Sequence, residues 1–198
     1  MTNFAKKAAF AATAAIVALA ATPAAAQSAT QESADGTATV KIYSPLTIAA
    51  PTATDAVVDF GILVGSFGTR PANNFNIDAT VAPTAASVCG GVAGWSCSGA
   101  PHRAQFNITG SVDSSVNVSF AATSINLLRS GGSAAVSADV IPLGLTLSDT
   151  TDSNGDGMAD LVLVNGAATV YVGGTLGVDA DNVDGVYEGS FTVNADYQ

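Results

Sequence analysis

Apolar and polar residues alternate along much of the chain, which is the pattern of β-strands with one face in a core and the other in water. The stretch 187–197 shows it most clearly. Tyr187, Phe191 and Val193 fall on one face, whereas polar residues such as Glu188 fall on the other. We therefore predict a strand over 187–197.

The same alternation, or a dense apolar run, recurs between turn-forming residues. The other segments expected as strands are 37–43, 46–48, 57–64, 104–110, 116–120, 140–147, 159–164 and 168–172. The pair Asn165-Gly166 is a strong hairpin signal. About seven to nine short strands joined by turns predict an all-β, antiparallel, immunoglobulin-like sandwich, as a single domain over 37–198. Only residues 124–129 would accommodate a helical turn.

Residues 1–26 have a different character. Lys6 and Lys7 precede an almost unbroken apolar run, and Ala24–Ala26 offer a cleavage site of small residues. This order predicts a secretory signal peptide, followed by a mobile polar segment over 27–36. A membrane anchor is the weaker alternative, because the run is shorter than the roughly 20 residues of a spanning helix. We expect export to the periplasm, the cell surface or the extracellular space, with no membrane span after cleavage.

Charge and cysteine content narrow the function classes. The chain has 16 acidic residues against 6 lysines and arginines, a net charge of −10. This balance argues against a nucleic-acid partner, because phosphate contacts need clustered cations. Export would place Cys89 and Cys97 in an oxidising compartment, so we predict a disulfide between them. It would pin segment 78–103, which is rich in small residues and is expected to be a surface loop.

No arrangement of residues predicts an enzyme. The single histidine, His102, follows a proline in the expected loop, and no serine lies in a G-x-S-x-G context. We interpret His102 as an exposed loop residue and expect no catalytic site.

One acidic cluster carries candidate chemistry. Asp152, Asn154, Asp156 and Asp160 occupy positions 1, 3, 5 and 9 of a loop that has Gly157 at position 6. Calcium prefers several such oxygen ligands on a tight turn. Two interpretations stay open, a calcium site or a polar hairpin loop without an ion. Calcium is the only cofactor that the sequence suggests.

Four segments together resemble the DUF4402 family of secreted bacterial proteins, whose function is unknown. They are 44–48 (SPLTI), 58–65 (VDFGILVG), 165–176 (NGAATVYVGGTL) and 185–197 (GVYEGSFTVNADY). Their plan is also similar to that of the spore coat protein U domain and of archaic chaperone–usher pilins. This resemblance implies an incomplete sandwich that a donor strand from another subunit completes, with strand 187–197 lining one side of the open groove.

The leading hypothesis is a structural subunit of a bacterial surface fibre. Its partners would be identical or related subunits, a periplasmic chaperone and an outer-membrane usher. Ala38, Val40 and Ile42 follow the polar N-terminal segment and form an alternating set that suits strand addition to a neighbour's sheet edge. The same residues could instead pair within their own domain. The alternative function is a self-contained, calcium-stabilised surface binding module or adhesin.

Overall fold

The computed structural model describes residues 37–66 and 70–198. The signal peptide predicted for 1–26 and the mobile segment predicted for 27–36 therefore lie outside the described residues. The chain divides into two compact units, Met1–Val40 and Lys41–Gln198. Of the first unit the structure describes residues 37–40, which belong to no helix or strand.

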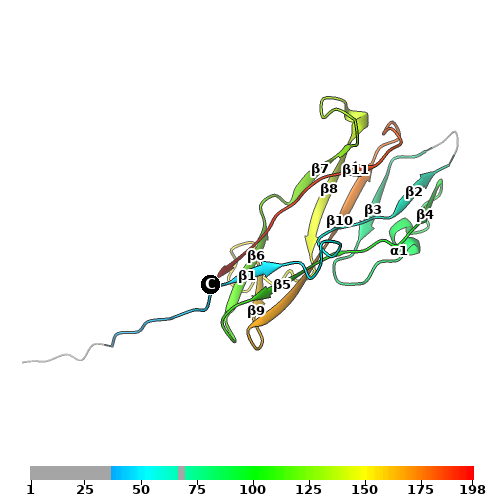
Figure 1. Ribbon diagram of the computed structural model, residues 1–198. Coiled ribbons are helices and arrows are strands. Elements are labelled where there is room, and N and C mark those ends of the chain that lie inside the picture. Colours follow the sequence, from blue (N-terminus) through cyan, green and yellow to red (C-terminus); the bar gives the residue numbers. More distant parts are fainter. Residues whose placement is uncertain (1–36, 67–69) are drawn as a thin grey trace, which may run out of the picture. The chain divides into compact units, whose positions relative to one another are not determined.

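The second unit is an all-β antiparallel sandwich, which confirms the predicted fold class (Figure 1). Its strands are β1 (Thr47–Ala49), β2 (Ile62–Gly65), β3 (Asn73–Ile77), β4 (Trp95–Ser98), β5 (Ala104–Thr109), β6 (Ser115–Phe120), β7 (Ser124–Arg129), β8 (Val140–Leu147), β9 (Ala159–Val162), β10 (Ala167–Val178), β11 (Tyr187–Glu188) and β12 (Val193–Tyr197). Helical structure in the described residues is confined to α1 (Ala85–Cys89) and one 3-10 turn, η1 (Ser137–Asp139).

The two layers of the sandwich differ in continuity. One layer is a seven-stranded sheet in the order β1-β5-β10-β8-β7-β11, and β3 joins it by pairing with the second half of β10. The other layer consists of two separate sheets, β12-β6-β9 and β2-β4. Alternate residues of β10, from Val170 to Val178, are buried toward this second layer. The long strand β10 therefore lies under both pieces.

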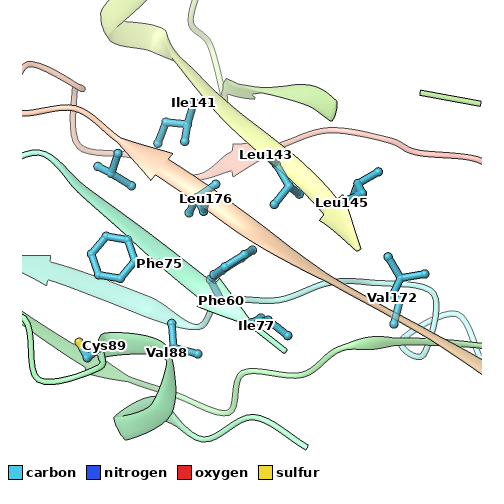
Figure 2. Close-up of a cluster of buried hydrophobic side chains, with 12 residues drawn as sticks. Phe60, Phe75, Ile77, Val88, Cys89, Ile141, Leu143, Leu145, Val172 and Leu176 are labelled. Atoms are coloured by element: carbon cyan, nitrogen blue, oxygen red, sulfur yellow. The ribbon is translucent and has the colours of Figure 1, made fainter. Parts of the chain in front are cut away.

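Each piece of the second layer covers its own apolar cluster. The larger cluster includes Phe75, Ile77 and Leu143, and Figure 2 shows these side chains gathered among β3, β8, β10 and α1. The smaller cluster lies between β5 and β10 on one side and β6 and β9 on the other, with Ile108 and Val116 fully buried. Burial of one such side chain contributes roughly 1.5–3 kcal/mol to folding. These clusters fix the two halves of the interrupted layer in place.

The C-terminal alternation is confirmed, but the predicted strand is divided. Its first part, β11, pairs with β7, and its last part, β12, pairs with β6 in the other layer. Residues 189–192 carry the chain from one layer to the other. At Gly189 a Cβ atom would lie 2.7 Å from Cδ2 of Leu127 and 3.0 Å from the backbone oxygen of Asn126, so a side chain here would require these neighbours to shift.

Three local predictions have clear outcomes. The Asn165-Gly166 turn is confirmed, because both residues have positive φ, 54° and 81°, as a tight two-residue hairpin turn requires. The helical turn at 124–129 is wrong, since these residues form β7, in which Ile125 and Leu127 alternate inward. The loop expected at 78–103 is also wrong in part, because it contains α1 and β4, whose apolar residues pack into the larger cluster.

Candidate functional site

A cleft of about 1230 Å³ opens between β2 and β11. One wall consists of residues 57–66, which include β2, and the other of residues 180–188, which include β11. The apolar floor comes from the inner face of the large sheet. The floor residues are Leu127, Ile141, Leu176 and Val178. We refer to this cleft as the β2–β11 groove.

Both walls of the groove present a strand edge with no strand partner among the described residues. β2 pairs only with β4, and β11 pairs only with β7. Ile62, Val64 and Val186 are also more than half exposed on these walls. A free strand edge beside exposed apolar side chains favours the addition of another strand.

An ion pair joins the two walls near one end of the groove. Nη1 of Arg70, which follows β2 in the chain, lies 2.7 Å from Oδ1 of Asp184 on the opposite wall. Nη2 of Arg70 also donates to the carbonyl oxygen of Ala180 at 3.3 Å. The stem of Arg70 covers Gly65, where a Cβ atom would lie 2.5 Å from the arginine Cγ. This contact bounds the groove at that end.

A second ion pair supports the β11 wall from behind. Nε of Arg129, at the end of β7, donates to Oδ1 of the buried Asp139 at 2.6 Å. The Ser133 amide donates to the other oxygen at 3.0 Å. The Arg129 contact and this amide hold the pKa of Asp139 below its ordinary value. Because Arg129 pairs in register with Tyr187, the carboxylate positions the strand that forms the wall.

The Tyr187 hydroxyl adds to this support. It lies 2.5 Å from the carbonyl oxygen of Val183 and 3.0 Å from that of Ala138. Burial raises the pKa of this phenol above its ordinary value. The hydroxyl is protonated at neutral pH, as any tyrosine is, and can donate to these carbonyl oxygens.

The predicted disulfide is confirmed and supports the β2 wall. Cys89 at the end of α1 is bonded to Cys97 in β4. Among the described residues β2 pairs with β4 alone, with Leu63 opposite Cys97. The N-terminus of helix α1 is capped by a capping box between Thr84 and Ser87. The disulfide therefore ties the groove wall to a capped helix in the core.

The predicted donor residues form no strand in the described part of the chain. Residues 37–46 have no assigned secondary structure, and Val40 and Ile42 are 82% and 87% exposed. The pairing of 37–43 within its own sheet, which the sequence left open, is thus not seen in this structure. The alternating apolar residues remain exposed to solvent.

The end of this segment is fixed to the C-terminal strand. The ring of Tyr43 stacks on that of Tyr197, with centroids 4.4 Å apart. The Tyr197 hydroxyl donates to the carbonyl oxygen of Ser44 at 2.8 Å. Thr47, a few residues on, pairs with Thr109, which in turn pairs with Ala167 at the start of β10. This anchor therefore lies at the first end of β10, whereas the groove lies at its last end.

The acidic loop forms a turn closed by its own carboxylates. Oδ1 of Asp152 accepts from the amides of Gly155 and Asp156, and its Oδ2 accepts from Gly157 at 2.9 Å. Oδ1 of Asp156 accepts from the Met158 amide. Among the described residues no three His, Cys, Asp or Glu side chains are grouped to hold a metal ion. Calcium binding stays a prediction.

The remaining two predicted ligands point elsewhere within this loop. Oδ1 of Asn154 accepts from the Asp156 amide at 3.0 Å, and its amide nitrogen donates to Asp156. Oδ2 of Asp160 accepts from the Ser153 amide, while its Oδ1 accepts from the Gln198 side chain. The four side chains are thus close along the loop, but their oxygens accept hydrogen bonds from backbone amides and from side-chain amide groups.

His102 lies in a β-bridge with Asp59, beside the groove wall. Its ring nitrogens lie near the carbonyl oxygens of Ala100 and Thr54, at 3.4 and 3.2 Å, and Nδ1 is 4.0 Å from the Asp59 carboxylate. None of these partners is a serine. The absence of a catalytic site stays a prediction.

The groove's ion pairs were not predicted from the sequence. Arg70 and Asp184 are separated by 114 residues, and nothing in their local patterns links them. The one sequence feature that could have drawn attention to these arginines is their rarity. The chain contains only three, Arg70, Arg103 and Arg129. Two of the three serve the walls of the groove.

Comparison with known proteins places the chain in a family. The family described as "Domain of unknown function (DUF4402)" matches residues 65–197, so the protein belongs to the DUF4402 family. The match begins within β2 and includes the groove walls from there on, but not the segment 37–43. No curated protein matches the chain. No helix in the described residues has the length and hydropathy that crossing a membrane would require.

Proposed function

We propose that this protein is an exported structural subunit of a bacterial surface fibre, in which each subunit inserts residues 37–43 into the β2–β11 groove of the next. The observation that carries the proposal is the coexistence of a groove with two free strand edges and an exposed alternating segment without a strand partner. The leader predicted for residues 1–26 would export the chain. A periplasmic chaperone and an outer-membrane usher would then deliver it to the fibre.

The chemistry of the segment suits the groove. Ala38, Val40 and Ile42 are spaced two residues apart, so in an extended strand they point to one side. Inserted in the groove, they would cover the apolar floor while the backbone paired with the free edges. Burying Val40 and Ile42 would contribute roughly 1.5–3 kcal/mol each, before the cost of ordering the segment.

The length of the chain favours exchange between subunits over insertion into the same subunit. Leu176 on the groove floor is nine residues beyond Ala167 along β10, which is about 30 Å. Ala38 is five residues from the anchored Tyr43, so it reaches at most about 18 Å from that anchor. A subunit that kept its Tyr43–Tyr197 stack could not fill its own groove with residues 37–43. A second subunit is free to bring its groove to residues 38–42 of the first, while Tyr43 of the first stays stacked on its own Tyr197.

The test uses the chain from residue 27 onward, purified and concentrated, with multimers measured by size-exclusion chromatography and unboiled gels. We expect a ladder of multimers for the native sequence. Val40→Asp should abolish the ladder, because a carboxylate would be buried on the apolar floor. Thr39→Asp is the matched control, since residue 39 faces outward in the same strand and should leave the ladder intact.

Thermal unfolding of each variant completes the test. Val40 is exposed in the single chain, so Val40→Asp should leave the melting temperature of the isolated subunit within about 2 °C of the native value. A monomeric native chain would contradict the proposal, as would a Val40→Asp variant that unfolds. Either result would favour a self-contained surface module.

A further inference from the structure

The walls of the β2–β11 groove carry acidic side chains, and one of them has no ion-pair partner among the described residues. Asp184 is paired with Arg70, and Asp59 lies beside His102. Glu188 is exposed on β11, lines the groove, and takes part in no such pair. In β11 it alternates with Tyr187, which packs toward the core, so Glu188 points outward.

The donor segment carries one cation on its own outward face. Lys41 is the only lysine after residue 7 in the sequence. It alternates with Val40 and Ile42, so it points away from the groove floor when these two point toward it. An extended segment added to the free edge of β11 would therefore place Lys41 on the same side as Glu188.

We propose, resting on the proposed function, that a second copy of the chain docks antiparallel to β11 with its Lys41 directly opposite Glu188. Glu188 is paired with Leu128 in β7, and one further step along the chain brings Gly189 beside Leu127. The same register sets the incoming Val40 opposite Gly189. Val40 then lies over the row of Leu127 and Ile141, which are paired with each other.

The fit of the neighbouring positions supports this register. Gly189 has no side chain, which leaves room for the incoming Val40. A larger residue at position 189 would itself crowd Leu127. Ala38 falls opposite Phe191, which lies in the segment that crosses between the layers and packs against the larger cluster. The smallest of the three donor side chains thus meets the bulky Phe191, and the same register sets Ile42 opposite Tyr187. Opposite charges directly across two strands stabilise a pair, and like charges destabilise it.

Engineered disulfides between two variants test the register. One chain carries Lys41→Cys and the other Glu188→Cys; they are refolded together and mildly oxidised, and covalent dimers are measured on non-reducing gels. Directly opposite residues have Cβ atoms about 4.5–5.5 Å apart, within reach of a disulfide after small adjustments. We expect a dimer from this pair. Thr39→Cys with Glu188→Cys, displaced by two residues, is the matched control and should give at least fivefold less.

A second pair of mixtures tests the direction of the strand. Antiparallel docking sets residue 39 opposite residue 190, so Thr39→Cys with Ser190→Cys should yield a dimer. Parallel docking would instead set residue 39 beside residue 186. A dimer from Thr39→Cys with Val186→Cys, without one from the Ser190→Cys mixture, overturns the proposed direction.

Charge reversal gives an independent readout. Lys41→Glu should slow multimer formation about fivefold at low salt, and Lys41→Glu combined with Glu188→Lys should restore the native rate. Multimers that form while the Lys41→Cys and Glu188→Cys mixture gives no dimer would overturn the register and leave the fibre function standing. A native chain that forms no multimers at all would overturn both.

Discussion

Arg70 and Asp184 form a 2.7 Å ion pair that connects the two walls of the groove across 114 residues of sequence. The arginine side chain is 22% exposed, but the aspartate is almost fully exposed. An exposed ion pair of this kind contributes only about 0–1 kcal/mol to the free energy of unfolding. Its effect should therefore be local, on the position of residues 180–186, more than on global stability.

Replacement of this arginine is the first prediction. Arg70→Ala should lower the free energy of unfolding by no more than about 1 kcal/mol and should increase amide hydrogen exchange over residues 180–186. The reason is that both Asp184 and the Ala180 carbonyl lose their partner. Arg70→Lys is the control, because a single ammonium can keep the Asp184 contact but cannot also reach Ala180 in the same geometry. Unchanged exchange in Arg70→Ala would contradict a bracing role.

The buried Asp139 predicts a pH dependence. Its pKa is held below the ordinary value mainly by the Arg129 hydrogen bond. A carboxyl with a lowered native-state pKa contributes stability that is complete above its unfolded-state pKa, about 3.9, and that is lost as pH falls through the native value. Denaturant unfolding should show Asp139→Asn to be less stable than the native chain at pH 7. This difference should shrink below about pH 4, and a difference independent of pH would exclude the mechanism.

Removal of the disulfide should weaken the β2 wall. The bond closes a loop with a sequence separation of 8 residues, for which chain entropy suggests a contribution of roughly 2–3 kcal/mol. The double variant Cys89→Ser with Cys97→Ser should lose about this amount in chemical unfolding. Alkylation of the unreduced native chain should label neither cysteine, whereas labelling of both would refute the bond.

The acidic loop offers a prediction about its turn. Asp152→Ala removes an acceptor for three backbone amides and should lower the free energy of unfolding by about 1 kcal/mol in the presence of a chelator. Asp152→Asn keeps one acceptor oxygen and should lose less. Because the turn closes through its own hydrogen bonds, a native melting temperature that is the same with chelator and with millimolar calcium would identify the loop as a polar turn without an ion. A rise with calcium that Asp156→Ala abolishes would establish the calcium site instead.

The alternation of side chains predicted the strands that lie half in a core. It succeeded for 104–109, 115–120 and 193–197, where one face meets an apolar cluster and the other meets water. It failed for 124–129, because Ile125, Leu127 and Leu128 in this short segment fit both a strand and a helical spacing. It also missed β4, whose small and cysteine residues carry little strand propensity.

The candidate site was only partly accessible from the sequence. The disulfide and the alternating set at 38–42 are local patterns, so they could be identified without a fold. The groove exists only in the folded protein. Its walls, 57–66 and 180–188, come together because β10 and β8 place the floor between them. Arg70 and Asp139 gain their roles from partners that no local spacing indicates.

β10 is twelve residues long and connects the anchored end of the domain to the groove end. In a fibre assembled as proposed, a pulling force would enter each subunit at one end of this strand and leave at the other. The force would then run parallel to the strands, so the hydrogen bonds of the inserted segment would be loaded together instead of being opened one at a time. Such a joint yields only when many bonds fail at once, which gives mechanical strength to a contact that contains no covalent link between subunits.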